Sequence, residues 1–240
     1  MEFDEYRRMA AVEDAHWWYR STRALLADHL GPRLPRNGLF LDAGSGTGAT
    51  GAWMDQFGQV VASDVEPMAL DLYAEQHSSA GRVVADLRQL PFADASFDAV
   101  LCVTVLYHAA ITDPAAAVAE LSRVVKPGGV VCLLEPGVRR LFRAHDREVH
   151  GARRFSLRDL RRLSTNAGLL PEIATGAYSF LVPLAAAKAL LERDRQASDL
   201  DNNQTGVGGL LGSVAALERS FLRRFRLPFG LSVVVIGRKP

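Results

Sequence analysis

The chain has 240 residues, of which 48% are hydrophobic, enough to build the core of one α/β domain. Lys and Arg number 28 and Asp and Glu number 27, so the formal net charge is +1. Dedicated nucleic-acid-binding domains carry a clear basic excess, and this balance argues against that class.

Both cysteines, Cys102 and Cys132, lie in apolar runs typical of buried strands, where thiols are more often inert than linked or metal-bound. A reducing cytoplasm is the expected compartment. The acidic N-terminus has no apolar segment typical of a signal peptide. The longest apolar stretch, residues 176–191, is interrupted by Pro183 and Lys188 and is too short to span a bilayer. We therefore expect no integral membrane segment.

The first half of the chain predicts helices, then strands that alternate with helices. Residues 4–30 predict one or two helices that contain the aromatic cluster 16–20. A short apolar run at 39–41 leads into a glycine loop at 42–48, and a helix is expected to begin near Thr50. Further strands are predicted at 60–64, 82–86 and 97–103, with a helix at 67–77.

The second half continues the alternation. Asp113 and Pro114 open a helix to Val125, because Asp is a good N-cap and Pro is favoured at the first helical position. The residues Lys-Pro-Gly-Gly at 126–129 end it, and a strand follows at 130–134. A capping box at Ser156 opens a helix to about Ala167, and late strands lie near 170–177 and 231–237. This pattern predicts a mostly parallel sheet with helices on both faces.

The expected ligand site lies at the carboxyl ends of the strands, where open α/β sheets bind their ligands. Glycines 44, 46 and 48 allow a tight loop and a close approach to a ligand. Because Gly46-x-Gly48-x-x-Gly51 also matches the dinucleotide fingerprint, an NAD(P)-dependent oxidoreductase is an alternative. A protein that binds S-adenosylmethionine (SAM) without transferring its methyl group is another.

Three carboxylates favour SAM over a dinucleotide. Asp42 suits the amino group of a methionine moiety and is a poor neighbour for a pyrophosphate. Asp64 can accept hydrogen bonds from ribose hydroxyls, a device that NAD enzymes share. Asp86 can accept the adenine amino hydrogen while Leu87 packs on the ring. Turn or cap roles remain the alternatives for all three. The expected cofactor site is completed by further residues from the loop, strand ends and N-terminal cluster: Gly44, Ser45, Gly46, Val65, Val103 and Trp18.

Three segments carry a family resemblance. Leu41-Asp42-Ala43-Gly44-Ser45-Gly46-Thr47-Gly48 resembles motif I of class I SAM-dependent methyltransferases. Residues 86–98 resemble the family's D-x-x-x-L-P-F-x-D-x-S-F-D segment, and residues 121–129 resemble L-x-R-V-L-K-P-G-G. The cluster His-Trp-Trp-Tyr-Arg at 16–20 resembles the N-terminal segment of a subgroup of the methyltransferase type 11/12-like enzymes.

The resemblance implies a Rossmann-like three-layer sandwich whose seven-stranded, mostly parallel sheet has an antiparallel last strand. We expect one domain over 1–240. Its parts are a helical lid (1–36), a cofactor-binding core (37–136) and a region of substrate-side insertions with the last two strands (137–240). The expected activity is methyl transfer from SAM to an O or N atom of a small-molecule acceptor, such as a secondary metabolite or a sugar-related compound.

The expected acceptor side lies beyond the fourth strand. His108 is a candidate base or positioning residue, with a structural role as the alternative. Tyr107 is a candidate pocket residue. His145 and Asp146 are candidate catalytic residues, whereas their spacing with His150 is poor for a metal site. His150 and Arg154 are candidate substrate-binding residues.

Two regions near the chain ends have alternative interpretations. The aromatic cluster 16–20 can form a lid over the cofactor or a plain core contact. The basic amphipathic stretch 219–226 can touch a membrane or a lipid-linked substrate, although a packed surface helix is the commoner interpretation. As partners we expect a small molecule and no nucleic acid, and we consider a homodimer.

Overall fold

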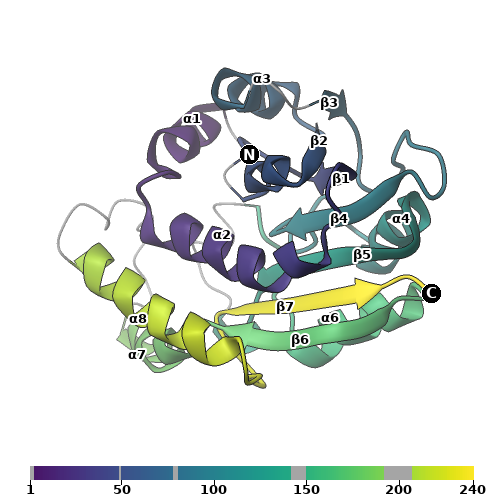
Figure 1. The fold of residues 1–240 in the computed structure, drawn as a ribbon. Coiled ribbons are helices and arrows are strands. Elements are labelled where there is room, and N and C mark those ends of the chain that lie inside the picture. The colour runs from purple at the N-terminus through teal and green to yellow at the C-terminus, as the bar shows by residue number, and fades with distance from the viewer. Residues whose placement is uncertain (1–2, 49, 78–80, 142–149, 192–206) are drawn as a thin grey trace.

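The computed structural model describes residues 3–48, 50–77, 81–141, 150–191 and 207–240. They form one seven-stranded sheet in the order β3-β2-β1-β4-β5-β7-β6 (Figure 1). The strands are β1 (Gly38–Ala43), β2 (Gly58–Asp64), β3 (Gly81–Val84), β4 (Phe97–Val103), β5 (Val125–Pro136), β6 (Leu170–Ala177) and β7 (Ser232–Arg238). The α-helices are α1 (Phe3–Val12), α2 (Trp17–His29), α3 (Pro67–Gln76), α4 (Pro114–Val124), α6 (Leu157–Asn166), α7 (Val182–Leu191) and α8 (Val207–Leu222).

The sheet has the predicted mixed topology. β1 pairs in parallel with β2 and β4, and β4 pairs in parallel with β5. β7 lies antiparallel between β5 and β6. The expectation of a mostly parallel sheet with an antiparallel last strand is confirmed.

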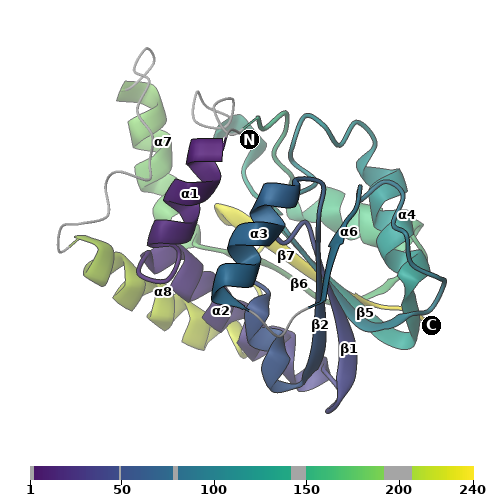
Figure 2. The same ribbon diagram turned by 90° about the horizontal axis from the view of Figure 1, so that it is seen from above.

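The alternation of side chains along each strand builds two core layers. In β5, Val131 and Leu133 face one layer, while Cys132 and Leu134 face the other. The first layer lies under α4 and α6, and the second lies under α2 and α8 (Figure 2). Both faces of the sheet are thereby covered, which gives the three-layer sandwich.

The two predicted helix starts are confirmed by their capping bonds. The Oδ1 atom of Asp113 accepts the backbone N–H groups of Ala115 at 2.9 Å and Ala116 at 3.1 Å. At α6, the hydroxyl of Ser156 accepts the Asp159 N–H and the Asp159 carboxylate accepts the Ser156 N–H. Because these bonds join residues at most three positions apart, short sequence patterns were enough to predict where α4 and α6 begin.

The prediction of a helix that begins near Thr50 is wrong. A five-residue 3-10 helix, η2 (Ala52–Gln56), lies there instead. Gly48 and Gly51 weaken an α-helix at this point, and the chain must reach β2 at Gly58 within a few residues. The Trp53 indole N–H donates to the Thr50 carbonyl at 2.8 Å and so satisfies one acceptor outside a helix.

None of the helices within the described ranges is both long and apolar enough to cross a membrane. The remaining 3-10 turns are η1 (Gly31–Arg33), η3 (Arg139–Leu141) and η4 (Ser179–Leu181).

Candidate cofactor and acceptor site

The glycine loop after β1 contains three residues with positive φ, Gly44 (72°), Gly46 (52°) and Gly48 (99°). A side chain at such a φ is strained. A Cβ on Gly44 would lie 2.3 Å from Cγ2 of Val105, so the loop packs directly against the segment that follows β4. A Cβ on Gly46 would meet only Cε of Met9, at 3.9 Å, which leaves space for ligand atoms over the loop.

Asp64 ends β2 and braces this loop. Its Oδ2 atom accepts the Gly46 N–H at 2.9 Å, and its Oδ1 atom accepts the Glu66 N–H at 3.0 Å. Burial raises the pKa of this carboxyl above its usual value. Each oxygen keeps a further lone pair, so the carboxylate can also accept hydroxyl donors from a ligand. The next residue, Val65, is 66% exposed and offers an apolar surface beside the carboxylate.

Asp42, at the end of β1, is a buried carboxylate with an unsatisfied atom. Its Oδ2 atom has no hydrogen-bond partner among the described residues. Burial and then the neighbouring Asp64 raise the pKa of Asp42 to about 7. A buried acceptor without a donor is costly, and a cationic ligand group would remove that cost.

Glu13 is a second such carboxylate, and the sequence did not point to it. It lies between α1 and α2, is 1% exposed, and accepts the hydroxyl of Thr47 in the glycine loop through Oε2. Its Oε1 atom is buried without a hydrogen-bond partner in the described part of the chain. Burial raises the pKa of Glu13. The N-terminal segment therefore brings a carboxylate onto the loop, a contact that only the three-dimensional structure reveals.

Asp86 lies just beyond β3 in a turn. The Arg88 side chain donates to both of its oxygens, with Nε–Oδ1 at 3.0 Å and Nη2–Oδ2 at 2.5 Å. This partner holds the pKa of Asp86 below its usual value. The Asp86 side chain is 37% exposed, whereas Leu87 is 5% exposed and packs in the core layer under α4. Little of the Leu87 side chain is thus free to stack on an adenine ring.

The segment after β4 is held by a buried carboxylate that sequence reasoning also missed. Glu135, near the end of β5, is fully buried. Its Oε1 atom accepts the N–H groups of Val105 at 3.1 Å and Leu106 at 2.8 Å, and Oε2 accepts the Tyr107 N–H at 3.2 Å. Burial outweighs these bonds and raises the pKa of Glu135 to about 8. Val103, which precedes this segment, is 6% exposed.

The other side of the same segment is bound by residues 150–153. The Ala152 N–H donates to the Tyr107 carbonyl at 2.8 Å, and the Ala109 N–H donates to the His150 carbonyl at 2.8 Å. The Arg153 guanidinium donates to the carbonyls of Leu106 and Ile111. Its charge therefore organises the loop, which leaves Arg153 poorly placed to bind an anion.

The structure brings three of the predicted acceptor residues together, namely Tyr107, His108 and the backbone of His150. Half-buried His108 lies beside Tyr107, with ring centroids 4.2 Å apart, and forms an isolated β-bridge with Gly151. His150 is exposed, and Arg154 donates to the Gly137 carbonyl at 3.2 Å. His145 and Asp146 lie outside the described residues.

The aromatic cluster of α2 packs against the core. Trp17 contacts Tyr178 edge-to-face, with centroids 5.7 Å apart, and Trp18 contacts Tyr19 in the same way at 4.9 Å. Both indoles lie against the core layer of α2 and α8. These contacts favour a packing role for both, while a role of Trp18 toward a cofactor stays a prediction.

The residues fit SAM better than a dinucleotide. Unsatisfied buried carboxylate oxygens of Asp42 and Glu13 suit an ammonium group, and open space lies over Gly46. A pyrophosphate is usually held at the N-terminus of an α-helix, yet the described residues after the loop form only the 3-10 helix η2. The antiparallel β7 also departs from the all-parallel order of dinucleotide-binding sheets.

Comparison with known proteins agrees with this assignment. Residues 41–133 match the family model described as a methyltransferase domain. The chain is 35% identical over 171 residues to malonyl-[acyl-carrier protein] O-methyltransferase of Enterobacter lignolyticus, covering 67% of this chain and 65% of the relative. Across the first curated relatives, the chain spans between 35% and 65% of their length.

Two solved structures show the same fold. A chain of the complex between the Haloferax volcanii Trm112 methyltransferase activator and a methyltransferase superposes with a TM-score of 0.64. It covers 100% of this chain and 96% of that chain at 24% identity. Phosphoethanolamine N-methyltransferase 2 of Haemonchus contortus, solved with SAM, has a TM-score of 0.62 at 18% identity and covers 96% of this chain and 57% of that one. Residues 41–133 thus carry a methyltransferase domain with the class I fold, and the buried carboxylates at its sheet edge fit SAM as the cofactor.

Proposed function

We propose that the protein transfers a methyl group from SAM to an oxygen or nitrogen atom of a small-molecule acceptor. The main support is the convergence at one sheet edge of the glycine loop, Asp42, Asp64 and the segment that carries His108. When bound, SAM supplies an electrophilic methyl group on a sulfonium. The protein has to align donor and acceptor and exclude water, and it needs a base only for an acceptor that loses a proton.

The nature of the acceptor is supported by charge and by one relative. The near-neutral chain suits a small molecule better than a nucleic acid. The name of the Enterobacter relative specifies an oxygen acceptor, which is consistent with an O-directed reaction here. His108 is the candidate that positions or deprotonates the acceptor, and Tyr107, His150 and Arg154 are candidates that shape its pocket. His145 and Asp146 stay further candidates on the acceptor side. A secondary metabolite or sugar-related compound is the acceptor class that we favour.

Residues 1–36 are proposed as a cover over the cofactor. The approach of Met9 to Gly46 and the bond between Glu13 and Thr47 support this role. Assignment to the subgroup with the His-Trp-Trp-Tyr-Arg segment is a further proposal, as is a cytoplasmic location, which two free buried cysteines support.

Replacing Asp64 by alanine should weaken SAM binding by about 1–3 kcal/mol, because ribose hydroxyls would lose their acceptor. Calorimetric titration with SAM measures this change. Asp71→Ala, an exposed change in α3, is the matched control and should leave binding unchanged. Equal affinity of the Asp64 variant and the parent protein would place the cofactor elsewhere.

Replacing Glu13 by glutamine should weaken SAM binding by roughly 10-fold or more, because the amide loses the charge that attracts the methionine ammonium. Binding of 5′-methylthioadenosine, which lacks the amino-acid moiety, should stay within about 2-fold of the parent. The ratio of the two affinities is the measured quantity. A parallel loss for both ligands would assign Glu13 a purely structural role through Thr47.

A further inference from the structure

The outward side of α8 and the segment that follows the helix carry large apolar side chains that are exposed to solvent. We name them the apolar stripe; its members are Leu210, Leu217, Phe221, Phe225 and Phe229. Leu210, Leu217 and Phe221 follow the spacing i, i+7, i+11 and so lie on one side of the helix. Every member is at least 45% exposed, and Leu217 reaches 72%. Single exposed apolar residues are ordinary, whereas a contiguous row of this kind marks an interaction surface.

The other side of α8 is already used for folding. Ala215 is 4% exposed and Leu222 is 1% exposed, and both belong to the core layer shared with α2. The helix is therefore apolar on two sides, of which the fold needs only one. Within the stripe, the rings of Phe221 and Phe225 stack with centroids 4.6 Å apart and thereby form a compact aromatic surface.

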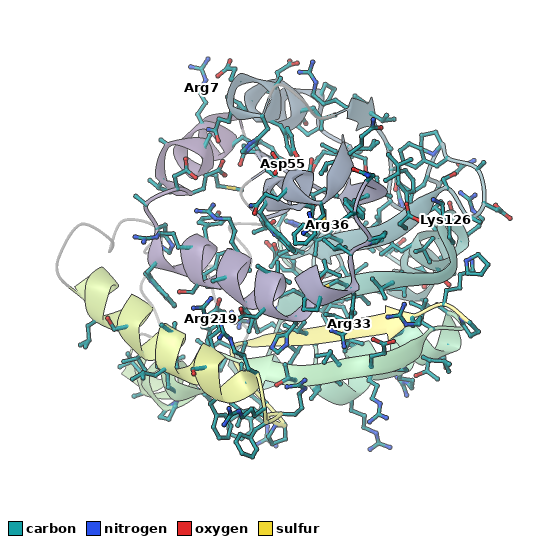
Figure 3. All side chains as sticks on the ribbon, in the orientation of Figure 1. Arg7, Arg33, Arg36, Asp55, Lys126 and Arg219 are labelled. Atoms are coloured by element: carbon teal, nitrogen blue, oxygen red, sulfur yellow. The ribbon has the colours of Figure 1, made fainter. Side chains whose placement is uncertain are left out.

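The end of α8 adds a positive charge beside the stripe. Arg219 and Arg223 share a single carboxylate, Asp28 of α2, with closest distances of 3.6 Å and 2.9 Å. Figure 3 shows Arg219 where α8 faces α2. Arg226 donates to the backbone carbonyls of Leu222 and Phe225, which are neutral and so do not balance its charge. Arg224 is exposed.

The nearest acid on α8 does not offset this charge. The two carboxylate oxygens of Glu218 accept the backbone N–H groups of Tyr178 at 2.6 Å and Ser179 at 2.8 Å. Glu218 is therefore turned toward the protein. Arg219 and Arg223 are thus turned toward α2, and the residues just beyond α8 leave the guanidinium groups of Arg224 and Arg226 without a carboxylate partner in the described part of the chain.

We propose that this face docks on a bilayer that contains anionic lipid. Phe and Leu side chains would enter the boundary between headgroups and acyl chains, and the arginines would lie at the level of the lipid phosphates. A second copy of the chain is a poorer occupant, because a two-fold contact would bring Arg224 and Arg226 close to the same residues of the other copy.

The position of the stripe relates docking to the candidate site. Phe229 shortly precedes β7, and the start of β7 at Ser232 pairs with Pro136 at the end of β5. The stripe thus reaches the sheet edge at which the parallel strands end and the glycine loop begins. The proposal concerns the surface alone and holds whichever acceptor the site takes.

Flotation of the purified full chain with vesicles tests the proposal. Vesicles of phosphatidylcholine with about one third phosphatidylserine should bind the protein, and pure phosphatidylcholine should bind it at least roughly 5-fold less. The triple change Leu217→Ser, Phe221→Ser, Phe225→Ser should reduce binding by roughly 10-fold or more. Arg224→Glu should also weaken it, and raised salt should act in the same direction.

Leu170→Ser is the matched control, because Leu170 is 60% exposed but lies at the start of β6, at the opposite end of that strand from Ala177. It should bind vesicles like the parent protein. Circular dichroism should show that all variants are folded, since the changed side chains are exposed. Failure of the parent to float with anionic vesicles would overturn the proposal. So would a concentration-dependent dimer that the triple change abolishes, because the occupant would then be a second copy.

Discussion

Replacing Gly51 by alanine should lower the free energy of unfolding by about 1–3 kcal/mol, the usual cost of overpacking a core, and should abolish measurable SAM binding. Gly51 has an ordinary φ of −114°, so backbone strain does not contribute. The added Cβ would lie 1.9 Å from Oδ2 and 2.2 Å from Cγ of Asp42. Asp42 is 1% exposed, and the clash must displace it or the loop. Chemical denaturation measures the first effect and calorimetry the second.

Gly31→Ala is the matched control for this change. Its Cβ would meet the Phe57 ring at 3.6 Å, an ordinary contact, so stability should change by less than about 1 kcal/mol. Adding Asp42→Ala to Gly51→Ala should restore part of the lost stability, because the clashing carboxylate is gone. An additive loss in the double variant would show that Gly51 does not lie against Asp42.

Replacing Glu135 by alanine should lower the free energy of unfolding by roughly 3 kcal/mol or more, since three backbone N–H groups would lose their acceptor in a buried site. The segment that bears Tyr107 and His108 should loosen as well. Methyl transfer should therefore fall more than SAM binding does. Denaturation, calorimetry and a turnover assay with an identified acceptor measure the three effects.

The conservative change Glu135→Gln should reveal the titration of this carboxyl. Its folded pKa of about 8 is raised above the unfolded value, so its protonated form favours folding at low pH. That contribution is lost as pH rises from the unfolded pKa of 4.5 through the folded pKa of about 8. The stability of the glutamine variant relative to the parent should thus increase between pH 5 and pH 9. Asp42, with a pKa of about 7, remains in both proteins and cancels in the comparison. Glu75→Gln, an exposed change in α3, should produce no such trend.

Local signals made much of the fold predictable. Three predicted features depend on residues that are close in the sequence, and all three are present in the structure. They are the strand that ends in Asp64, the cap at Asp113 and the capping box at Ser156. The prediction of a helix near Thr50 was wrong, because the glycine-loop motif was taken to lead directly into a helix although Gly48 and Gly51 disfavour one there.

The contacts that organise the candidate site could not be predicted in this way. Glu13 meets Thr47 across 34 positions, and Glu135 meets Val105 across 30. Neither carboxylate belongs to a short motif, and only the packing of the N-terminal segment and of β5 brings them to the loops. The role of Asp86 toward adenine stays a prediction, and its pairing with Arg88 depends on the geometry of the turn after β3.

Calorimetric titration of the full chain with SAM, S-adenosylhomocysteine and NADH is the most direct test of the cofactor assignment. Micromolar binding of SAM and S-adenosylhomocysteine without binding of NADH is the expected result. Binding of NADH alone would contradict it and would make the glycine loop a dinucleotide site.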